Sequence, residues 1–255
     1  MEFKKKVSSL ISGRFVCQHS TVGRRSTKKR KLRFKEIAIR ILLALLISQA
    51  LYLALLRVVN PPVTLTQLSA FIELKRLERD YVPLIEIPDD VRLAVIASED
   101  QRYLKHGAFD WQSVETVLRA KENRRHLRGA STITQQVAKN IFLWQQRSWI
   151  RKGLEAYFAV LLELTMDKRR ILELYLNIAE MGPGVFGIEA AAKHYFGKPA
   201  RTLTPRESAL IAACLPNPKI YHPDKPSPHT RAKADWILEQ MKYLRATHAA
   251  EELLR

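Results

Sequence analysis

Cysteine is scarce in this sequence of 255 residues, which contains only Cys17 and Cys214. No Cys/His spacing typical of a zinc site accompanies them. The two cysteines lie on either side of a long apolar stretch, so a membrane crossed by that stretch would separate them. We therefore expect neither a structural disulfide nor a zinc site.

Runs of alternating apolar residues and internal repeats are also missing, which argues against a substantial sheet. Helical signals are present instead. The segment "TPRESALIAACLPNP" has Thr204 as N-cap, Pro205 at the first helical position and Glu207 three residues after the cap. Pro216 is expected to stop this helix.

Three more segments read as helices. In "IPDDVRLAVIASEDQRYL", Asp89 or Asp90 is expected to cap an apolar run. Two further segments, residues 148–164 and 167–181, place apolar residues at helical spacing. These residues are Ile150, Leu154, Tyr157, Phe158 and Leu161 in the first, and Ile171, Leu174, Tyr175 and Ile178 in the second. We predict a mainly α protein in which residues 60–255 form one helical domain, ample for a hydrophobic core.

A literal match to the dinucleotide-binding pattern G-x-G-x-x-G occurs at residues 182–187, "GPGVFG". That fingerprint requires a preceding strand, whereas here a helix is expected before it and Pro183 lies inside it. We therefore interpret this segment as a flexible loop beside a cleft.

Positive charge is concentrated at the N-terminus. The formal net charge is +18, and residues 1–36 hold twelve Lys or Arg against Glu2 and Glu36. Behind this tail lies "IAIRILLALLISQALYLALLRVV", residues 37–59, which is long enough to span a bilayer. Arg40 and Arg57 are expected to snorkel from its ends. The sequence thus predicts a cytoplasmic tail (1–36), a transmembrane anchor (37–59) and an extracytoplasmic body (60–255).

Two rival interpretations of the N-terminal region are weaker. A secretory signal peptide usually has a shorter apolar region and a small-residue cleavage site, and no convincing A-x-A follows here. A nuclear signal or nucleic-acid arm is disfavoured because the "KKRKLRFK" run adjoins the apolar span. We expect no nucleic-acid partner.

Candidate catalytic residues begin with "ASEDQRYLKHGAFD", where Glu99 and Asp100 end an apolar helical run. A carboxylate in this position is a candidate general base, because partial desolvation raises its proton affinity. His106 follows seven residues after Glu99 and on a continued helix would share its face. The alternative is an acidic pair at a helix end, solvated or paired with a nearby Arg.

A basic cluster follows, made of Lys139, Arg147, Arg151 and Lys152, with Glu155 close behind. The spacing of four between the two arginines, and between Arg151 and Glu155, fits ordinary i, i+4 pairs on a solvated helix. It also fits a forked cationic site for phosphate. Glu155 shares its helix face with Ala159 and Leu162, which favours the site.

The segment "GASTITQQVAKN", residues 129–140, opens a helix with uncharged polar side chains and carries a single cation, Lys139. Such a start offers backbone N–H groups and a positive dipole end to an anion, and Gly129 allows a ligand to approach closely. Gln135, Gln136 and Lys139 project within one turn. The alternative is a capped polar helix without a functional role.

Taken together, "EDQRYLKHGAFD", "GASTITQQVAKN", "RKGLEAYFAVLLE" and "KRRILELYLN" resemble the peptidoglycan glycosyltransferase family, over roughly residues 85–220. The short chain and single anchor look like its monofunctional members. No transpeptidase domain fits, because K-T-G and S-D-N are absent and the S-x-x-K at Ser26 lies in the tail.

This resemblance implies a lysozyme-like helical fold with a membrane-proximal jaw subdomain. It implies that lipid II is polymerised into β-1,4-linked glycan at the inner (plasma) membrane, with the catalytic domain periplasmic and undecaprenyl pyrophosphate released. Glu99 then looks like the general base and Glu155 like a second essential carboxylate. Lys139, Arg147, Arg151 and Lys152 look like the pyrophosphate site. His106, Thr132 and Gln136 match further substrate-binding positions, although "HGAFD" departs from the family's usual H-x-G-x-D.

The chemistry is coherent with these residues. An α-linked donor and a β-linked product require one in-line displacement, with a base on the incoming hydroxyl and cations on the leaving pyrophosphate. A divalent metal, expected to be Mg²⁺ held beside Glu155, would share the second role. The expected partners are lipid II, the growing glycan chain and membrane lipid, with cell-wall synthesis or division proteins as further candidates. Leu143 and Trp144 are candidates for contact with the membrane interface, with helix packing as the alternative.

Two other function classes stay open at this point. A lytic enzyme would share the fold and use one glutamate, but it has no evident use for the cationic set. An inactive membrane-anchored scaffold would be expected to lose at least one of Glu99, Lys139 and Glu155, and all three are present.

Overall fold

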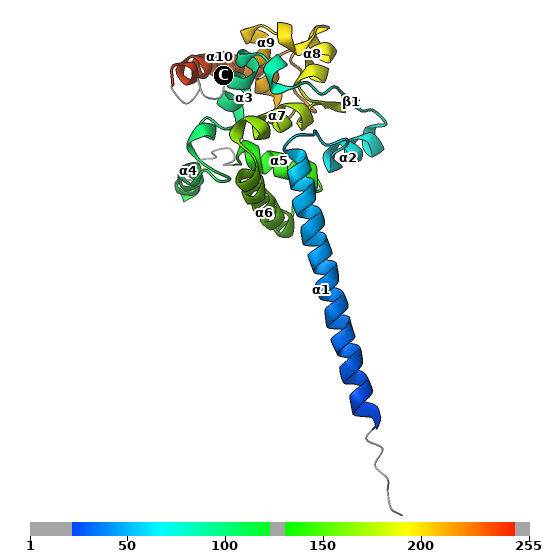
Figure 1. The fold of residues 1–255 in the computed structure, drawn as a ribbon. Coiled ribbons are helices and arrows are strands. Elements are labelled where there is room, and N and C mark those ends of the chain that lie inside the picture. The colour runs from blue at the N-terminus through cyan, green and yellow to red at the C-terminus, as the bar shows by residue number, and fades with distance from the viewer. Residues whose placement is uncertain (1–21, 123–130, 248–255) are drawn as a thin grey trace, which may run out of the picture. The chain divides into compact units, whose positions relative to one another are not determined.

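The computed structural model describes residues 22–122 and 131–247, and its contacts divide the chain into two compact units, Met1–Leu51 and Tyr52–Arg255 (Figure 1). Helix α1 (Val22–Leu56) contains the apolar stretch Lys35–Leu56, 22 residues that are long and apolar enough to cross a membrane. The helix therefore ends three residues before the expected end of the anchor, ahead of Pro61 and Pro62. The boundary between the units lies within this helix.

The body, Tyr52–Arg255, is mainly helical, as predicted. The body includes the last turn of α1, and Leu53 and Leu56 of that turn are buried in the core of the body. Its longer helices are α2 (Leu65–Leu74), α3 (Asp89–Glu99), α4 (Trp111–Glu122), α5 (Ile133–Phe142), α6 (Trp149–Thr165), α7 (Lys168–Ile178), α8 (Ile188–Phe196), α9 (Pro205–Cys214) and α10 (Pro228–Arg245). Short 3₁₀ helices are η1 (Leu84–Glu86), η2 (Tyr103–Lys105) and η3 (Ala200–Thr202).

Two groups of helices pack around the site. Helices α3, α9 and α10 contact one another, and α5 packs against both α6 and α7 (Figure 1). Buried aliphatic residues from α3, α5 and α7 join in one core cluster with those of α9 and α10. This core holds the C-terminal end of α3 beside the first turns of α5.

Helix starts agree with the sequence signals in one case and differ in another. Thr204 caps α9, its side chain accepting from the N–H of Glu207 while the Glu207 carboxylate accepts from the Thr204 N–H, and Pro205 is the first helical residue. Helix α3 instead begins at Asp89 with Pro88 as its N-cap, and no side chain caps it. The expected aspartate cap is therefore wrong, and the acidic pair Asp89 and Asp90 lies inside the first turn, where its charge favours the helix dipole.

The segment "GPGVFG" is not a flexible loop, contrary to expectation. It forms a buried hairpin of β2 (Glu180–Gly182) and β3 (Val185–Phe186), and β1 (Glu78–Arg79) completes a small sheet in the order β1-β3-β2. Gly187 has φ of 83°, and a Cβ there would lie 2.7 Å from the Asn177 carbonyl oxygen, so only glycine fits this turn. As expected, no substantial sheet is present in the described residues.

Helix α6 buries two charged residues beside two apolar ones. Its buried stripe is Arg151, Glu155, Ala159 and Leu162. Of the apolar residues at helical spacing, Phe158 and Leu161 pack against the core cluster, whereas Ile150, Leu154 and Tyr157 are exposed, as is Trp149 before them. The sequence pattern predicted the helix correctly, but it did not predict which of its residues face the core.

Candidate active site

Glu99 is the last residue of α3, and its carboxylate is held by Gln136. Gln136, one turn into α5, donates its amide Nε2–H to Oε2 at 2.8 Å. The single hydroxyl proton of Ser98 has the Ala212 carbonyl at 2.8 Å and Oε1 of Glu99 at 3.3 Å as acceptors. The buried Tyr175 of α7 donates its hydroxyl to the Gln136 amide oxygen at 3.4 Å. Because Tyr175 occupies the amide oxygen, the NH₂ group of Gln136 turns towards Glu99.

The start of α5 is satisfied by the protein itself. Thr132 is its N-cap and forms a reciprocal box with Gln135, and the N–H of Ile133 donates to Oδ2 of Asp100 at 3.1 Å. Thr132 and the backbone N–H groups of this helix start were expected to bind a ligand. The expectation of free N–H groups for an anion is wrong for Ile133 and Gln135, because Asp100 and Thr132 already accept from them. Gly129 lies outside the described residues.

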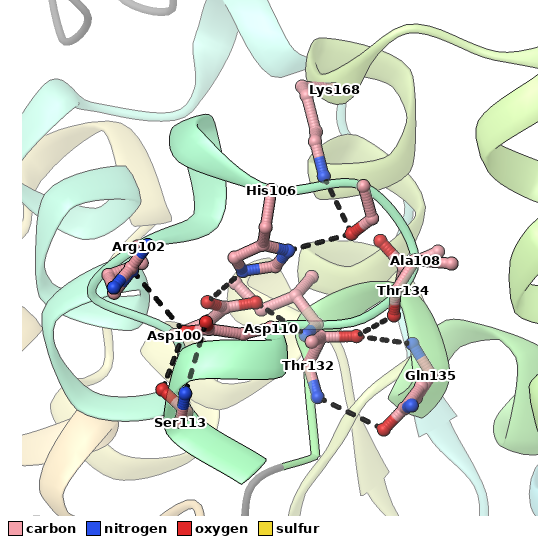
Figure 2. Close-up of polar contacts among 12 residues, drawn as sticks. Asp100, Arg102, His106, Ala108, Asp110, Ser113, Thr132, Thr134, Gln135 and Lys168 are labelled. Atoms are coloured by element: carbon pink, nitrogen blue, oxygen red, sulfur yellow. Dashed lines mark hydrogen bonds and ion pairs between the residues drawn. The ribbon is translucent and has the colours of Figure 1, made fainter. Parts of the chain in front are cut away.

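His106 does not share a helix with Glu99; it contacts Asp100, the residue that accepts from the first N–H of α5. Helix α3 ends at Glu99, and His106 follows η2 in an extended conformation, so the shared-face expectation is wrong. One ring nitrogen lies 2.7 Å from Oδ1 of Asp100 and the other 2.7 Å from the carbonyl of Gly107 (Figure 2). Both neighbours are acceptors, so both contacts are hydrogen bonds only when the ring is a doubly protonated imidazolium.

The environment of His106 favours that charged form. Burial alone would lower the pKa of His106, but the hydrogen bonds to Asp100 and Gly107 and the charge of Asp100 raise it above its ordinary value. Thr132 belongs to the same network, because its hydroxyl donates to the carbonyl of Ala108 at 2.9 Å (Figure 2). His106 and Thr132 were predicted to contact substrate. In the structure their hydrogen bonds instead fix the start of α5.

Lys139 lies one turn beyond Gln136 on α5. Burial lowers the pKa of its ammonium, against the opposing charge of Glu155, which raises it. Among residues 22–122 and 131–247, no side chain is within hydrogen-bonding distance of its Nζ, although Glu155 and Glu99 act on it through their charge. A desolvated ammonium without a direct partner is suited to an anionic ligand.

Glu155 is buried and fully paired. Its Oε2 accepts from Nη1 of Arg151 at 2.7 Å and its Oε1 accepts from Nζ of Lys152 at 2.6 Å. The predicted i, i+4 pair between Arg151 and Glu155 is thus present, but it is buried rather than solvated. Arg147 precedes α6 and its N-cap Ser148, so its spacing of four to Arg151 is not a helical one.

These residues meet in one cavity of about 540 Å³, which we call the cationic cavity. It brings together Glu99, Gln136, Lys139, Arg147, Arg151, Lys152 and Glu155, all predicted from the sequence, with Ser131, Gln145, Leu215 and Pro216. Four basic side chains thus surround a space that has Glu99 at its wall. His106 and Thr132 do not line it.

A second cavity, of about 300 Å³, adjoins the cationic cavity at Glu99 and is also lined by the charged residues Asp100, Arg102 and Asp110. Glu99 and Ser131 line both cavities. Its other lining residues include Ser98, Gln101, Ser113, Thr132 and, from α10, Trp236. Gln145, Ser131 and Trp236 were not predicted as site residues. Of these three, only Ser131 could have been predicted from the sequence, because it lies in the polar segment that opens α5.

The residues present do not fit a protein-held Mg²⁺ at Glu155. Both oxygens of that carboxylate accept hydrogen bonds from cations, and the cavity offers only one other carboxylate, Glu99, among four basic side chains. Asp100, His106 and Asp110 also come within 4.8 Å of one another. There, however, His106 and Ile133 already donate to Asp100, and Ser113 donates to Asp110.

Known proteins resemble this chain over the same region. The family model described as Transglycosylase matches residues 66–242, which include every residue lining the cationic cavity. A biosynthetic peptidoglycan transglycosylase of Aeromonas hydrophila is 47% identical over 209 residues, covering 80% of this chain and 89% of that protein. Those of Stutzerimonas stutzeri (45% over 220 residues, 84% and 91%) and Haemophilus influenzae (52% over 167 residues, 65% and 68%) are similar too. The resemblance inferred from the motifs is confirmed: the chain belongs to the transglycosylase family.

Proposed function

We propose that this protein is a peptidoglycan glycosyltransferase that polymerises lipid II into β-1,4-linked glycan strands and releases undecaprenyl pyrophosphate. The observation that carries the proposal is the cationic cavity, which is lined by Glu99, a carboxylate with no basic partner among the described residues, together with four basic residues. A lytic enzyme needs a carboxylate but no such cationic set. Membership of the transglycosylase family and the names of the relatives support the same reaction.

Glu99 is the general base in this proposal. It takes the proton from the 4-hydroxyl of the acceptor sugar as that oxygen attacks the anomeric carbon of the donor. The amide of Gln136 holds the carboxylate at 2.8 Å, and Tyr175 fixes the orientation of that amide. Inversion follows, because the attacking oxygen enters opposite the leaving pyrophosphate.

The basic side chains stabilise the leaving group. As the anomeric C–O bond breaks, negative charge grows on the pyrophosphate, and preplaced cations stabilise it without reorganising. Lys139, without a direct partner, contacts the phosphate, and Arg147 and Lys152 approach from the cavity rim. Glu155 holds Arg151 and Lys152 in place through its two hydrogen bonds.

A divalent cation stays a prediction from the family resemblance alone. Because Glu155 is already paired by two cations, we assign the neutralisation of the leaving group to the protein's basic residues and no step to a metal. The need for added Mg²⁺ is measured directly by polymerisation with and without a chelator.

The apolar helix fits a membrane anchor. With the basic tail cytoplasmic, the body lies on the periplasmic side, where it meets lipid II by lateral diffusion. The exposed apolar face of α6, which includes Trp149, Ile150 and Leu164, fits contact with the bilayer surface. Leu143 is buried and therefore packs in the body, whereas Trp144 is 42% exposed.

The test is polymerisation of lipid II by the purified full-length protein, with Glu99→Gln as the variant. Glutamine keeps the shape of the side chain but cannot accept the proton, so we expect long glycan from the wild type and a rate lower by about 10²-fold or more in the variant. Glycan length and released undecaprenyl pyrophosphate are measured.

Equal polymer from both proteins would remove Glu99 from the role of base while keeping the reaction. Cleavage of preformed glycan by the wild type, without polymerisation, would replace the proposed function by a lytic one.

A further inference from the structure

Helix α1 ends inside the body and not at its surface. Its last turn, residues 52–56, belongs to the body, and Leu53 and Leu56 are 3% and 1% exposed. Side chains buried to this extent are part of a core and not of a simple tether. The last turn contacts α5 and α7, the two helices that together hold an amide against Glu99.

Arg170, in the first turn of α7, binds the end of α1. The carbonyls of Ala54 and Leu55 accept from backbone N–H groups just beyond the helix, whereas the Leu56 carbonyl accepts from Nε of Arg170 at 2.9 Å. Nη1 of Arg170 donates to Glu173, one turn further along α7, at 2.7 Å, which holds the guanidinium in this position. A cation at the C-terminal end of a helix also interacts favourably with the helix dipole. The end of α1 is thus fixed to α7.

Helix α7 also orients the amide beside Glu99. Tyr175 lies five residues after Arg170, is buried, and donates its hydroxyl to the amide oxygen of Gln136 at 3.4 Å. Gln136 in turn donates to Glu99 at 2.8 Å. Because so short a stretch of helix moves as one rigid element, a displacement of the first turn of α7 also displaces the Tyr175 hydroxyl.

A second contact joins the last turn of α1 to α5. The ring of Tyr52 meets the ring of Phe142, the last residue of α5, edge-on with 5.8 Å between their centroids. Phe142 also stacks on Phe158 of α6 at 4.3 Å. Aromatic pairs prefer particular geometries, so these rings fix the end of the helix that carries Gln136 and Lys139. The last turn of α1 therefore contacts both helices on which the placement of the Gln136 amide depends.

We propose that the last turn of α1 is part of the scaffold of the active site, and that Arg170 and Tyr52 are positioning residues that connect it to Gln136 and Glu99. This inference rests on the proposed function, since it concerns the base of that reaction. Neither positioning residue lines the cationic cavity, and both act through α5 and α7. Helix α1 then does more than attach the body, because the Glu99 carboxylate is correctly held only while the end of that helix is seated.

The first experiment uses Arg170→Met in the full-length protein, which keeps the length of the side chain and removes both of its hydrogen bonds. We expect kcat for polymerisation of lipid II to fall roughly fivefold with KM changed by less than about twofold, because the Gln136 amide moves while the cationic cavity keeps its residues. Arg170→Lys, which keeps the charge and one donor, should recover part of the loss. Arg206→Met is the matched control and should keep the wild-type rate, because Arg206 joins α9 to Asp235 of α10 and lines neither cavity.

A double-mutant cycle separates positioning from a general loss of structure. Gln136→Ala removes the amide through which Arg170 acts, so adding Arg170→Met to it should lower kcat by less than about twofold. Losses that multiply in the double variant would overturn the inference, as would an Arg170→Met protein with the wild-type kcat.

Hydrogen exchange measures the same connection without turnover. In Arg170→Met and in Tyr52→Leu we expect the backbone amides of α5 to exchange at least about fivefold faster than in the wild type, while those of α9 stay unchanged. Arg206→Met should leave the exchange of α5 unchanged.

Wild-type exchange of α5 in both Arg170→Met and Tyr52→Leu would also overturn the inference. If Arg170→Met fails to fold, Arg170→Lys and Tyr52→Leu still decide it. Faster exchange of α5 in these variants of a protein that does not elongate glycan would retain the connection between α1 and Gln136 and reject the proposed reaction.

Discussion

At the scale of single residues, His106 shows how a residue near the chemistry acts through others. Its imidazolium joins Asp100 to Gly107, and the other Asp100 oxygen holds the first N–H of α5 (Figure 2). Its side chain is 6% exposed, so it offers little surface to a substrate. Burial and the charge of Lys168 lower the pKa of His106, but the hydrogen bonds to Asp100 and Gly107 and the charge of Asp100 outweigh them and raise it.

The raised pKa of His106 predicts a pH-dependent stability. A histidine whose folded pKa exceeds its unfolded value of about 6.5 stabilises the protein fully below that value and loses the contribution as pH rises through the folded pKa. His106→Gln should therefore cost about 1–2 kcal/mol in unfolding free energy at pH 6 and less at pH 8.5. Thermal unfolding of the wild type and the variant across this pH range measures the difference between their unfolding free energies. A difference that grows with pH would contradict the raised pKa of His106.

At the scale of elements, α5 carries the site, because Gln136 and Lys139 both project from it. Thr132 starts this helix through a capping box and also bonds the Ala108 carbonyl. Thr204 starts α9 through the same kind of box, away from both cavities. The two threonines are thus matched in local structure and differ in what their helices carry.

We expect Thr132→Ala and Thr204→Ala each to lower the unfolding free energy by about 1–2 kcal/mol, since each removes a cap. Only Thr132→Ala should also lower kcat, by about tenfold, because a frayed start of α5 displaces Gln136 and Lys139. Chemical denaturation and polymerisation rates at a temperature where both variants are folded test this. Equal activity losses in the two variants would show that stability, not placement, is responsible.

At the scale of the whole molecule, the exposed apolar face of α6 and the apolar segment of α1 both suit contact with a lipid bilayer. Helix α6 presents Arg151 and Glu155 inward and Trp149 outward, so the same helix would serve the cationic cavity and the bilayer surface. A substrate held in the bilayer by its lipid tail then reaches the cavity with its pyrophosphate near the headgroups.

Trp149→Glu places a charge on this face without touching the cavity lining. In proteoliposomes we expect the full-length variant to polymerise lipid II roughly tenfold more slowly, and in detergent to approach the wild-type rate, because the cost is that of putting a carboxylate at the bilayer. Tyr243→Glu on α10 is the control. An equal loss in detergent would place the effect in the site rather than at the membrane.

The sequence by itself determined the mainly helical fold, the apolar span, the cap of α9 and seven of the residues that line the cationic cavity. These are local or compositional properties: helical period, an N-cap followed by Glu207, and a motif order shared with a family. The same local reasoning failed in part at α6, where Ile150 and Leu154 are exposed and Arg151 is buried, and it failed at "GPGVFG", which is a buried hairpin. Periodicity predicts that a helix has two different faces, but it does not predict which face packs against the core.

Only the tertiary structure decided which donors stay available to a ligand. It brought Asp100 to the start of α5, where the sequence left N–H groups for an anion, and it paired Glu155 with two cations where a metal was expected. It also placed Trp236, more than a hundred residues away in the chain, in the lining of a cavity that Glu99 lines too. These outcomes depend on contacts between distant segments, because burial forces each polar group to find a partner, and which partner it finds is set by how the helices pack.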